Sequence, residues 1–128
     1  MKFEGKILLV DDEVHVRKFI GLILKQLGAT AIFEAANGKD AVEIFKRESP
    51  NLVLLDVNMP VQDGIQTLRE IRTLSQECAV VMLTSLANRQ TVEEALTLGA
   101  DNYIRKDTPK DEILAALRQT IEESFSAD

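Results

Sequence analysis

The stretch Asn51–Gly64, NLVLLDVNMPVQDG, determines the fold that this chain is expected to adopt. Leu52 to Leu55 are all apolar, without the alternation of a half-exposed strand, and Asp56 ends the run. Such a run predicts a strand buried on both faces, as in a parallel sheet. A carboxylate at its end would lie at the edge of the sheet where open α/β proteins bind ligands. Taken alone, Asp56 is more safely interpreted as a residue that ends a strand or caps a helix.

The same arrangement, an apolar run that ends on a polar residue, occurs elsewhere in the chain. Ile7–Val10 is followed by Asp11 and Asp12, and Ala79–Leu83 is followed by Thr84. Each run fits a buried strand that delivers a polar group at its C-terminal end. With two shorter segments added, the predicted strands are 7–10, 30–35, 52–56, 79–83 and 101–104.

Helical patterns separate these strands, because apolar residues recur there at a spacing near 3.6 residues. Gly28 and Gly99 stand where C-terminal glycines end helices, and Asn37 is a candidate N-cap. Thr108 and Pro109 are predicted to be the N-cap and first residue of the last helix. Five strands alternating with five helices predict an α/β fold, with a parallel sheet covered on both faces and right-handed crossovers.

The composition is that of one globular domain over residues 1–128, with 45% hydrophobic and 28% charged residues. The net charge of −6 argues against direct binding to nucleic acid or to anionic membranes. No apolar run approaches the roughly 20 residues of a membrane span. The single cysteine, Cys78, is predicted to be a small buried hydrophobic residue. A chain with no internal disulfide fits the reducing cytoplasm.

Polar residues should gather at one edge of the predicted sheet, because the C-terminal ends of parallel strands meet there. They are Asp11 and Asp12, Asp56, Thr84 and, after the fifth strand, Lys106. Carboxylates this close repel one another unless a cation joins them, and an all-oxygen ligand set suits Mg²⁺. A carboxylate can also attack phosphorus, and a metal, a lysine and a hydroxyl would support that transfer.

Further short motifs follow in order along the chain: Asn58-Met59-Pro60, Asp63-Gly64, Thr84-Ser85, Gly99-Ala100-Asp101 with Tyr103, and Lys106. With these motifs, the acidic pair and Asp56, the chain resembles the receiver domain of two-component response regulators. Its length is similar to that of the single-domain chemotaxis receivers. The resemblance covers nearly the whole chain. It implies a three-layer, flavodoxin-like, doubly wound fold with strand order 2-1-3-4-5.

The resemblance also implies a role for each residue at the predicted edge. Asp56 would accept a phosphoryl group from a sensor histidine kinase or a phosphotransfer protein. Asp12 would bind Mg²⁺ directly and Asp11 mainly through water. Asp56 itself and the backbone carbonyl of Asn58 would complete the protein ligands. Lys106 would pair with a phosphoryl oxygen.

Thr84 and Tyr103 are implied to form the switch. The Thr84 hydroxyl would bond the phosphoryl group and move inward, and Tyr103 would rotate into the space vacated. This would reshape the face of the fourth helix, fifth strand and fifth helix, where a downstream protein would dock. The domain would be a monomer or weak dimer. It would not be a conventional enzyme, although it would assist its own phosphotransfer and dephosphorylation.

The chain departs from the family pattern at Asp107, where a proline preceded by a cis bond is usual. A cis bond before a non-proline residue costs roughly 2.5–4 kcal/mol, so the Lys106–Asp107 bond is predicted to be trans. Leu86 is larger than the usual alanine and is predicted to shield the phosphoryl group from water. His15 is expected to be a solvent-facing helix residue.

Three alternatives to a phosphorylated receiver are considered. A pseudo-receiver would be an interaction module that ignores phosphate, and the intact acid, threonine and lysine set argues against it. A haloacid-dehalogenase-like phosphatase also uses an aspartyl nucleophile but needs a second acid two residues on, where this chain has Asn58. A flavodoxin-like electron carrier would need a Ser/Thr/Gly-rich loop after the first strand, which this chain lacks.

Overall fold

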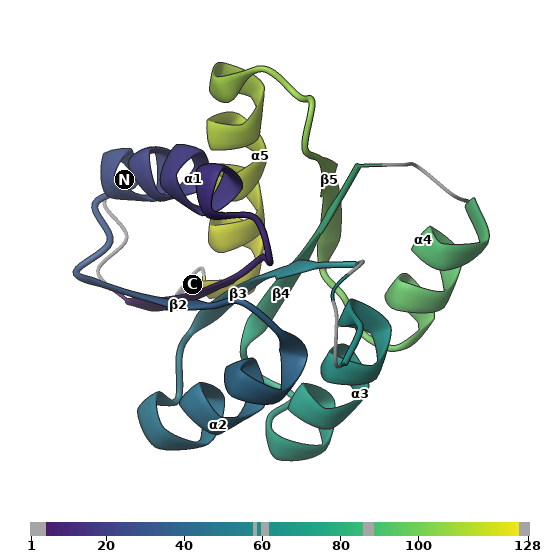
Figure 1. The fold of residues 1–128 in the computed structure, drawn as a ribbon. Coiled ribbons are helices and arrows are strands. Elements are labelled where there is room, and N and C mark those ends of the chain that lie inside the picture. Colours follow the sequence, from purple (N-terminus) through teal and green to yellow (C-terminus); the bar gives the residue numbers. More distant parts are fainter. Residues whose placement is uncertain (1–4, 58, 60–61, 86–88, 126–128) are drawn as a thin grey trace.

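A computed structural model of the chain describes residues 5–57, 59, 62–85 and 89–125. Strands and helices alternate along these residues, as the sequence predicts (Figure 1). In chain order they are β1 (Lys6–Val10), α1 (Val14–Gln26), β2 (Ala31–Ala35), α2 (Gly38–Glu48), β3 (Leu52–Asp56), α3 (Gly64–Leu74), β4 (Ala79–Thr84), α4 (Arg89–Thr97), β5 (Asn102–Arg105) and α5 (Lys110–Phe125).

The strands form one parallel sheet in the order β2-β1-β3-β4-β5, which confirms the predicted strand order. Helices α1 and α5 cover one face, and α2, α3 and α4 cover the other (Figure 1). This is the three-layer, doubly wound arrangement expected for strands that are apolar along their whole length.

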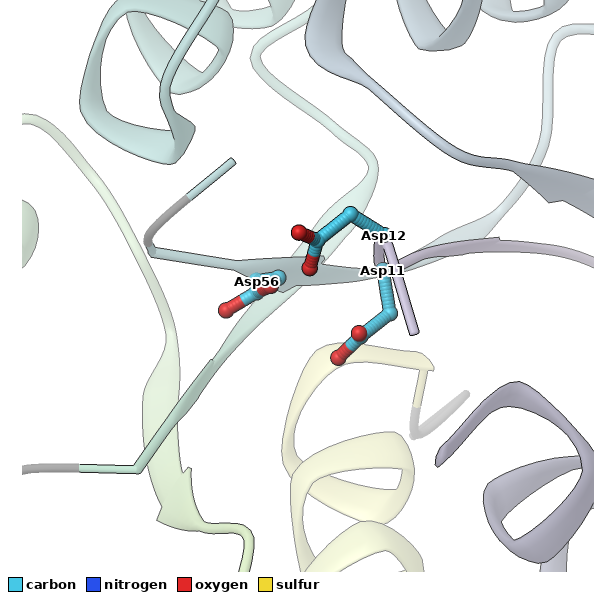
Figure 2. A group of neighbouring side chains, drawn as sticks. All are labelled: Asp11, Asp12 and Asp56. Atoms are coloured by element: carbon cyan, nitrogen blue, oxygen red, sulfur yellow. The ribbon is translucent and has the colours of Figure 1, made fainter. Parts of the chain in front are cut away.

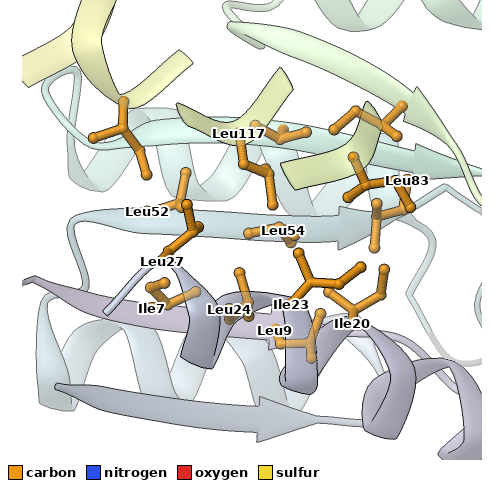
Figure 3. Packing of buried hydrophobic residues seen from close by; sticks show 14 of the residues in the cluster. Ile7, Leu9, Ile20, Ile23, Leu24, Leu27, Leu52, Leu54, Leu83 and Leu117 are labelled. Atoms are coloured by element: carbon orange, nitrogen blue, oxygen red, sulfur yellow. The ribbon is translucent and has the colours of Figure 1, made fainter. Parts of the chain in front are cut away.

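Burial on both faces explains why β1 and β3 are apolar without interruption. Ile7 and Leu9 of β1 pack with α1 and α5, together with Leu52 and Leu54 of β3 (Figure 3). The residues between them along each strand pack against the opposite helices. Every residue of β3 is buried, including Asp56. The strand that carries Asp56 is therefore covered along its whole length, as β4 is.

Within the described residues, the helix ends at Gly28, Asn37 and Gly99 agree with the predicted signals, and the start of the last helix does not. Gly28 and Gly99 have φ angles of 91° and 103°, the left-handed conformation that glycine tolerates. The Asn37 side chain accepts a hydrogen bond from the backbone of Asp40 and caps α2. The predicted start of the last helix at Thr108 and Pro109 is wrong by one residue.

That helix, α5, begins at Lys110, and the Pro109 carbonyl accepts a bond from Ile113. The Thr108 N–H instead bonds to the carbonyl of Arg105 and closes the turn that follows β5. Thr108 therefore belongs to this turn and not to the helix. None of the described helices is both long and apolar enough to cross a lipid bilayer.

Candidate functional site

Three carboxylates come together where β1 and β3 end (Figure 2). One oxygen from each of Asp11, Asp12 and Asp56 lies within 4.8 Å of the others. Asp11 and Asp56 are buried, with 0% and 2% of their surfaces exposed, whereas Asp12 is exposed. The predicted convergence of these acids at the sheet edge is therefore present. Asp12 leaves the group open to solvent on one side.

Lys106 supplies the positive charge of the site. Its Nζ lies 2.7 Å from Asp11 Oδ2 and 3.1 Å from Asp56 Oδ1. Burial alone would lower the pKa of Lys106, but the hydrogen bond to Asp11 and the charges of Asp56 and Asp11 outweigh it and raise the pKa. The ammonium therefore stays charged at neutral pH and joins the two buried carboxylates.

The turn after β5 directs Lys106 to the site despite the unusual residue that follows it. The Lys106 N–H bonds to the Thr84 carbonyl at 2.8 Å, and the Thr108 N–H closes the turn on Arg105. No cis peptide bond occurs among the described residues, so the prediction of a trans Lys106–Asp107 bond is confirmed. The Asp107 carboxylate accepts two bonds from the Arg105 guanidinium, at 3.1 and 2.9 Å.

Glu13 belongs to the site as well, although the sequence analysis did not assign it a role. Its carboxylate lies 3.5 Å from Lys106 Nζ, and its backbone N–H donates to Asp11 Oδ1 at 2.9 Å. The only signal in the sequence is its position directly after the acidic pair. His15 lies 3.7 Å from Glu13, with 80% of its side chain exposed, so it faces solvent as expected.

Gly64 allows the start of α3 to approach the backbone of β3. A Cβ at this position would overlap the carbonyl oxygen of Asp56 and lie 2.8 Å from Val57 Cα. The Gly64 N–H bonds to the Val57 carbonyl at 2.9 Å, and Asp63 caps the helix by accepting from Gln66. The Asp63-Gly64 motif therefore lets the N-terminal end of α3 pack directly against the backbone of Asp56 and Val57.

Thr84 and Tyr103 lie on neighbouring strands at the β4–β5 side of the site. Thr84 is buried at the end of β4, with 4% of its surface exposed, and Tyr103 of β5 is 39% exposed. Both border a cavity of about 10 Å³ that is also lined by Val57, Thr91 and Ala95. A cavity of this volume holds about one water molecule. Tyr103 is therefore a partly exposed residue of the edge strand β5 and not part of the buried core.

Two of the predicted positions, Asn58 and Leu86, lie outside the residues that the structure describes. The described donors suit a hard divalent cation, because Asp11, Asp12 and Asp56 offer three carboxylate oxygens close together. Two of these acids are buried and fixed by the sheet, and the third opens to water. The donor set therefore fits Mg²⁺, which keeps several waters when it binds proteins.

Comparison with known proteins agrees with this geometry. A family model described as the response regulator receiver domain matches residues 7–118. Over 116 residues the chain is 36% identical to the chemotaxis protein CheY of Bacillus subtilis, which covers 91% of this chain and 97% of that protein. It is 33% identical over 114 residues to the sporulation initiation phosphotransferase F of the same organism, covering 89% of this chain and 91% of that protein. A solved CheX–CheY–BeF3–Mg²⁺ complex from Borrelia burgdorferi matches with a TM-score of 0.85 and 31% identity, over 95% of this chain and 90% of that chain.

Proposed function

The chain belongs to the response regulator receiver domain family of two-component signalling, and we propose that Asp56 is its phosphoacceptor. The observation that carries the proposal is the contact of one ammonium, Lys106 Nζ, with both Asp11 and Asp56 beside the exposed Asp12. A carboxylate nucleophile in this setting has a cation at hand for the incoming negative charge. We take residues 1–128 as a single receiver domain.

In the proposed transfer, an oxygen of the Asp56 carboxylate attacks the phosphorus of a phosphohistidine on a sensor kinase or phosphotransfer protein. The new O–P bond forms as the N–P bond breaks, and the histidine nitrogen keeps the electron pair of the broken bond. Asp12, Asp56 and the Asn58 carbonyl would hold Mg²⁺ directly and Asp11 mainly through water, and the ion would supply positive charge to offset the phosphoryl group. Lys106, whose Nζ lies 3.1 Å from Asp56 Oδ1, would pair with a phosphoryl oxygen.

The readout of phosphorylation is proposed to pass through Thr84 and Tyr103. Thr84 would donate its hydroxyl hydrogen to a phosphoryl oxygen, and Tyr103 would then rotate toward the small cavity that the two residues border. The exposed surface of α4, β5 and α5 would change with it and bind a downstream protein. The relative solved with BeF3 and Mg²⁺ was crystallised together with a second protein, CheX, which supports a protein as the partner.

Labelling of Asp56 tests this proposal directly. The purified chain is incubated with Mg²⁺ and a small-molecule phosphodonor, and acid-stable, hydroxylamine-labile label is measured. We expect Asp56→Ala to abolish this label, whereas Asp111→Ala, which removes an exposed acid at the start of α5, should retain it. Label that persists in Asp56→Ala would overturn the assignment.

A pseudo-receiver that ignores phosphate is the main alternative, and beryllofluoride separates the two. With Mg²⁺ present, beryllofluoride should shift the amide resonances near Asp56 and Tyr103 if the site binds a phosphoryl group. Unchanged spectra would favour the pseudo-receiver. Multiple turnover of a phosphoester by the isolated chain would instead favour the phosphatase.

A further inference from the structure

The turn between β1 and α1 carries Asp12, but the usual capping contacts do not hold it. Glu13 is the N-cap residue of α1, yet its side chain makes no capping hydrogen bond, and the first turn of α1 contains no acidic residue. The turn also has to keep like charges together, which repel one another. Within the turn, the Glu13 N–H donates to Asp11 Oδ1 at 2.9 Å, and a second contact with the Asp11 backbone comes from α1.

Arg17, one turn into α1, makes that contact. Its Nη1 donates to the backbone carbonyl of Asp11 at 2.5 Å, and its Nε donates to Glu34 Oε1 at 2.8 Å. Glu34 lies on β2, opposite Leu9 of β1. The Arg17 side chain is only 16% exposed, so the guanidinium is largely enclosed between the helix and the edge of the sheet.

The contacts of Arg17 join three elements that meet at the acidic turn. Its own backbone N–H bonds to the Glu13 carbonyl at 3.1 Å, and on the other side the Asp11 N–H bonds to the Ala35 carbonyl at 3.1 Å. The backbone of Asp11 is thus held by hydrogen bonds at both its N–H and its carbonyl. Because the Asp11 carbonyl belongs to the peptide bond that leads into Asp12, its orientation limits where the Asp12 carboxylate can lie.

We propose that Arg17 is a positioning residue for the divalent-cation site, acting through the Asp11 carbonyl and braced by Glu34. The inference rests on the proposed function, since it presumes that Asp11, Asp12 and Asp56 bind a cation. A guanidinium suits this task because it donates two hydrogen bonds in fixed directions, which an ammonium cannot do. Residues that orient metal ligands typically change metal affinity about 10–100-fold when they are replaced.

The sign of the effect separates positioning from plain electrostatics. Removing a positive charge beside three carboxylates makes the local potential more negative, which by itself would tighten Mg²⁺ binding. A positioning role predicts the opposite result, because a disordered Asp12 binds the cation less well. The two explanations therefore differ in direction and not only in magnitude.

The test measures Mg²⁺ affinity by calorimetric titration with MgCl2 alone, on the wild-type chain and its variants. We expect Arg17→Met to raise the Kd for Mg²⁺ about tenfold and Arg17→Lys to raise it by less. Arg118→Met is the matched control, because it removes an exposed arginine of α5 and should leave the Kd unchanged.

Glu34→Ala provides an independent variant in case Arg17→Met does not fold. Glu34→Ala and Glu34→Gln both remove the Glu34 charge, but only Glu34→Gln keeps an acceptor for Arg17 Nε, so the comparison cancels the electrostatic effect. We expect Glu34→Ala to raise the Kd by a smaller factor than Arg17→Met and by a larger factor than Glu34→Gln. An unchanged or lower Kd in both Arg17→Met and Glu34→Ala would overturn the positioning role. Absence of Mg²⁺ binding in the wild-type chain would instead count against the proposed function.

Discussion

The carboxylate half and the lysine half of the site are held in place by different means. Asp11 follows the central strand β1, which is buried from Ile7 onward. Asp56 ends the central strand β3, which is buried throughout. Lys106 follows the edge strand β5, where only Ile104 is fully buried. The turn that carries it is held by two backbone bonds, from the Lys106 N–H to the Thr84 carbonyl and from the Thr108 N–H to the Arg105 carbonyl, and by the exposed Arg105–Asp107 pair.

The difference separates what folding determines from what local contacts determine. Packing of two helical layers fixes the acids, so they should keep their positions only as long as the sheet is intact. The lysine is positioned by short-range contacts near the surface, where changes cost little stability. The half of the site nearest the proposed switch residue Tyr103 is thus also the half that can be altered most easily.

Gly64→Ala should have the largest effect, because it strikes the packed half. The added Cβ would overlap the Asp56 carbonyl, and the neighbouring atoms belong to backbone that cannot move aside cheaply. Overpacking of this kind costs about 1–3 kcal/mol of unfolding free energy, and we expect the upper end of that range together with loss of Asp56 labelling. Denaturant unfolding monitored by circular dichroism measures the first quantity.

Gly21→Ala is the matched control for this substitution. A Cβ at Gly21 in α1 meets no atom within 4 Å, so the change should raise stability by up to about 1 kcal/mol through helix propensity. If both alanine variants proved equally stable, the packed half would not depend on the close approach of α3 to Asp56.

Lys106→Met tests how much the stability of the protein depends on the positive charge beside the buried carboxylates. Removing one partner of a fully buried ion pair costs about 3–5 kcal/mol, and because Asp12 opens this site to water we expect about 2 kcal/mol. Mg²⁺ can replace the lost charge, so millimolar Mg²⁺ should raise the unfolding midpoint more in the variant than in the wild type. Thermal unfolding with and without Mg²⁺ measures this difference.

Lys110→Met removes an exposed lysine at the start of α5 and should change neither the stability nor its dependence on Mg²⁺. An equal response to Mg²⁺ in Lys106→Met and the wild type would show that the ammonium and the cation do not share the same carboxylates.

The packed half was largely predictable from the sequence, and the reason is physical. A short uninterrupted apolar run is typical of a strand covered on both faces. Parallel strands bring their C-terminal ends to one edge of the sheet. That logic places Asp11, Asp12 and Asp56 together without knowledge of any contact. The strand order itself came from resemblance, because apolar runs do not state which strands are neighbours.

The contacts that hold the turns were not predictable in this way. Nothing in the sequence singles out Arg17, and its bond to Glu34 joins residues 17 positions apart on different elements. The sequence does not indicate that the Glu13 carboxylate contacts Lys106, because the two residues are far apart along the chain. Thr108 has the residue type of an N-cap, but the first carbonyl that accepts a helical bond is that of Pro109, one residue later. Side-chain partners of this kind depend on tertiary geometry.

The smallest effect is expected in the lysine half, at the Arg105–Asp107 pair. Asp107 borders the same surface hollow as Lys106 and Glu13, and Arg105 holds its carboxylate by two hydrogen bonds. Both side chains are about half exposed or more, so breaking the pair should cost no more than about 0.5 kcal/mol of stability. Its effect should appear in the chemistry instead.

Arg105→Ala would release a carboxylate beside Lys106, where it can compete with Asp56 for the ammonium, so we expect labelling of Asp56 to slow about two- to threefold. Asp107→Ala removes the competitor and should label at the wild-type rate, and so should the double variant. If the pair acted only as a brace for the turn, both single variants and the double variant would slow labelling alike. Initial rates of labelling at saturating Mg²⁺ distinguish the two patterns. Slow labelling in Arg105→Ala alone would show that Arg105 keeps the Asp107 carboxylate from competing with Asp56 for Lys106.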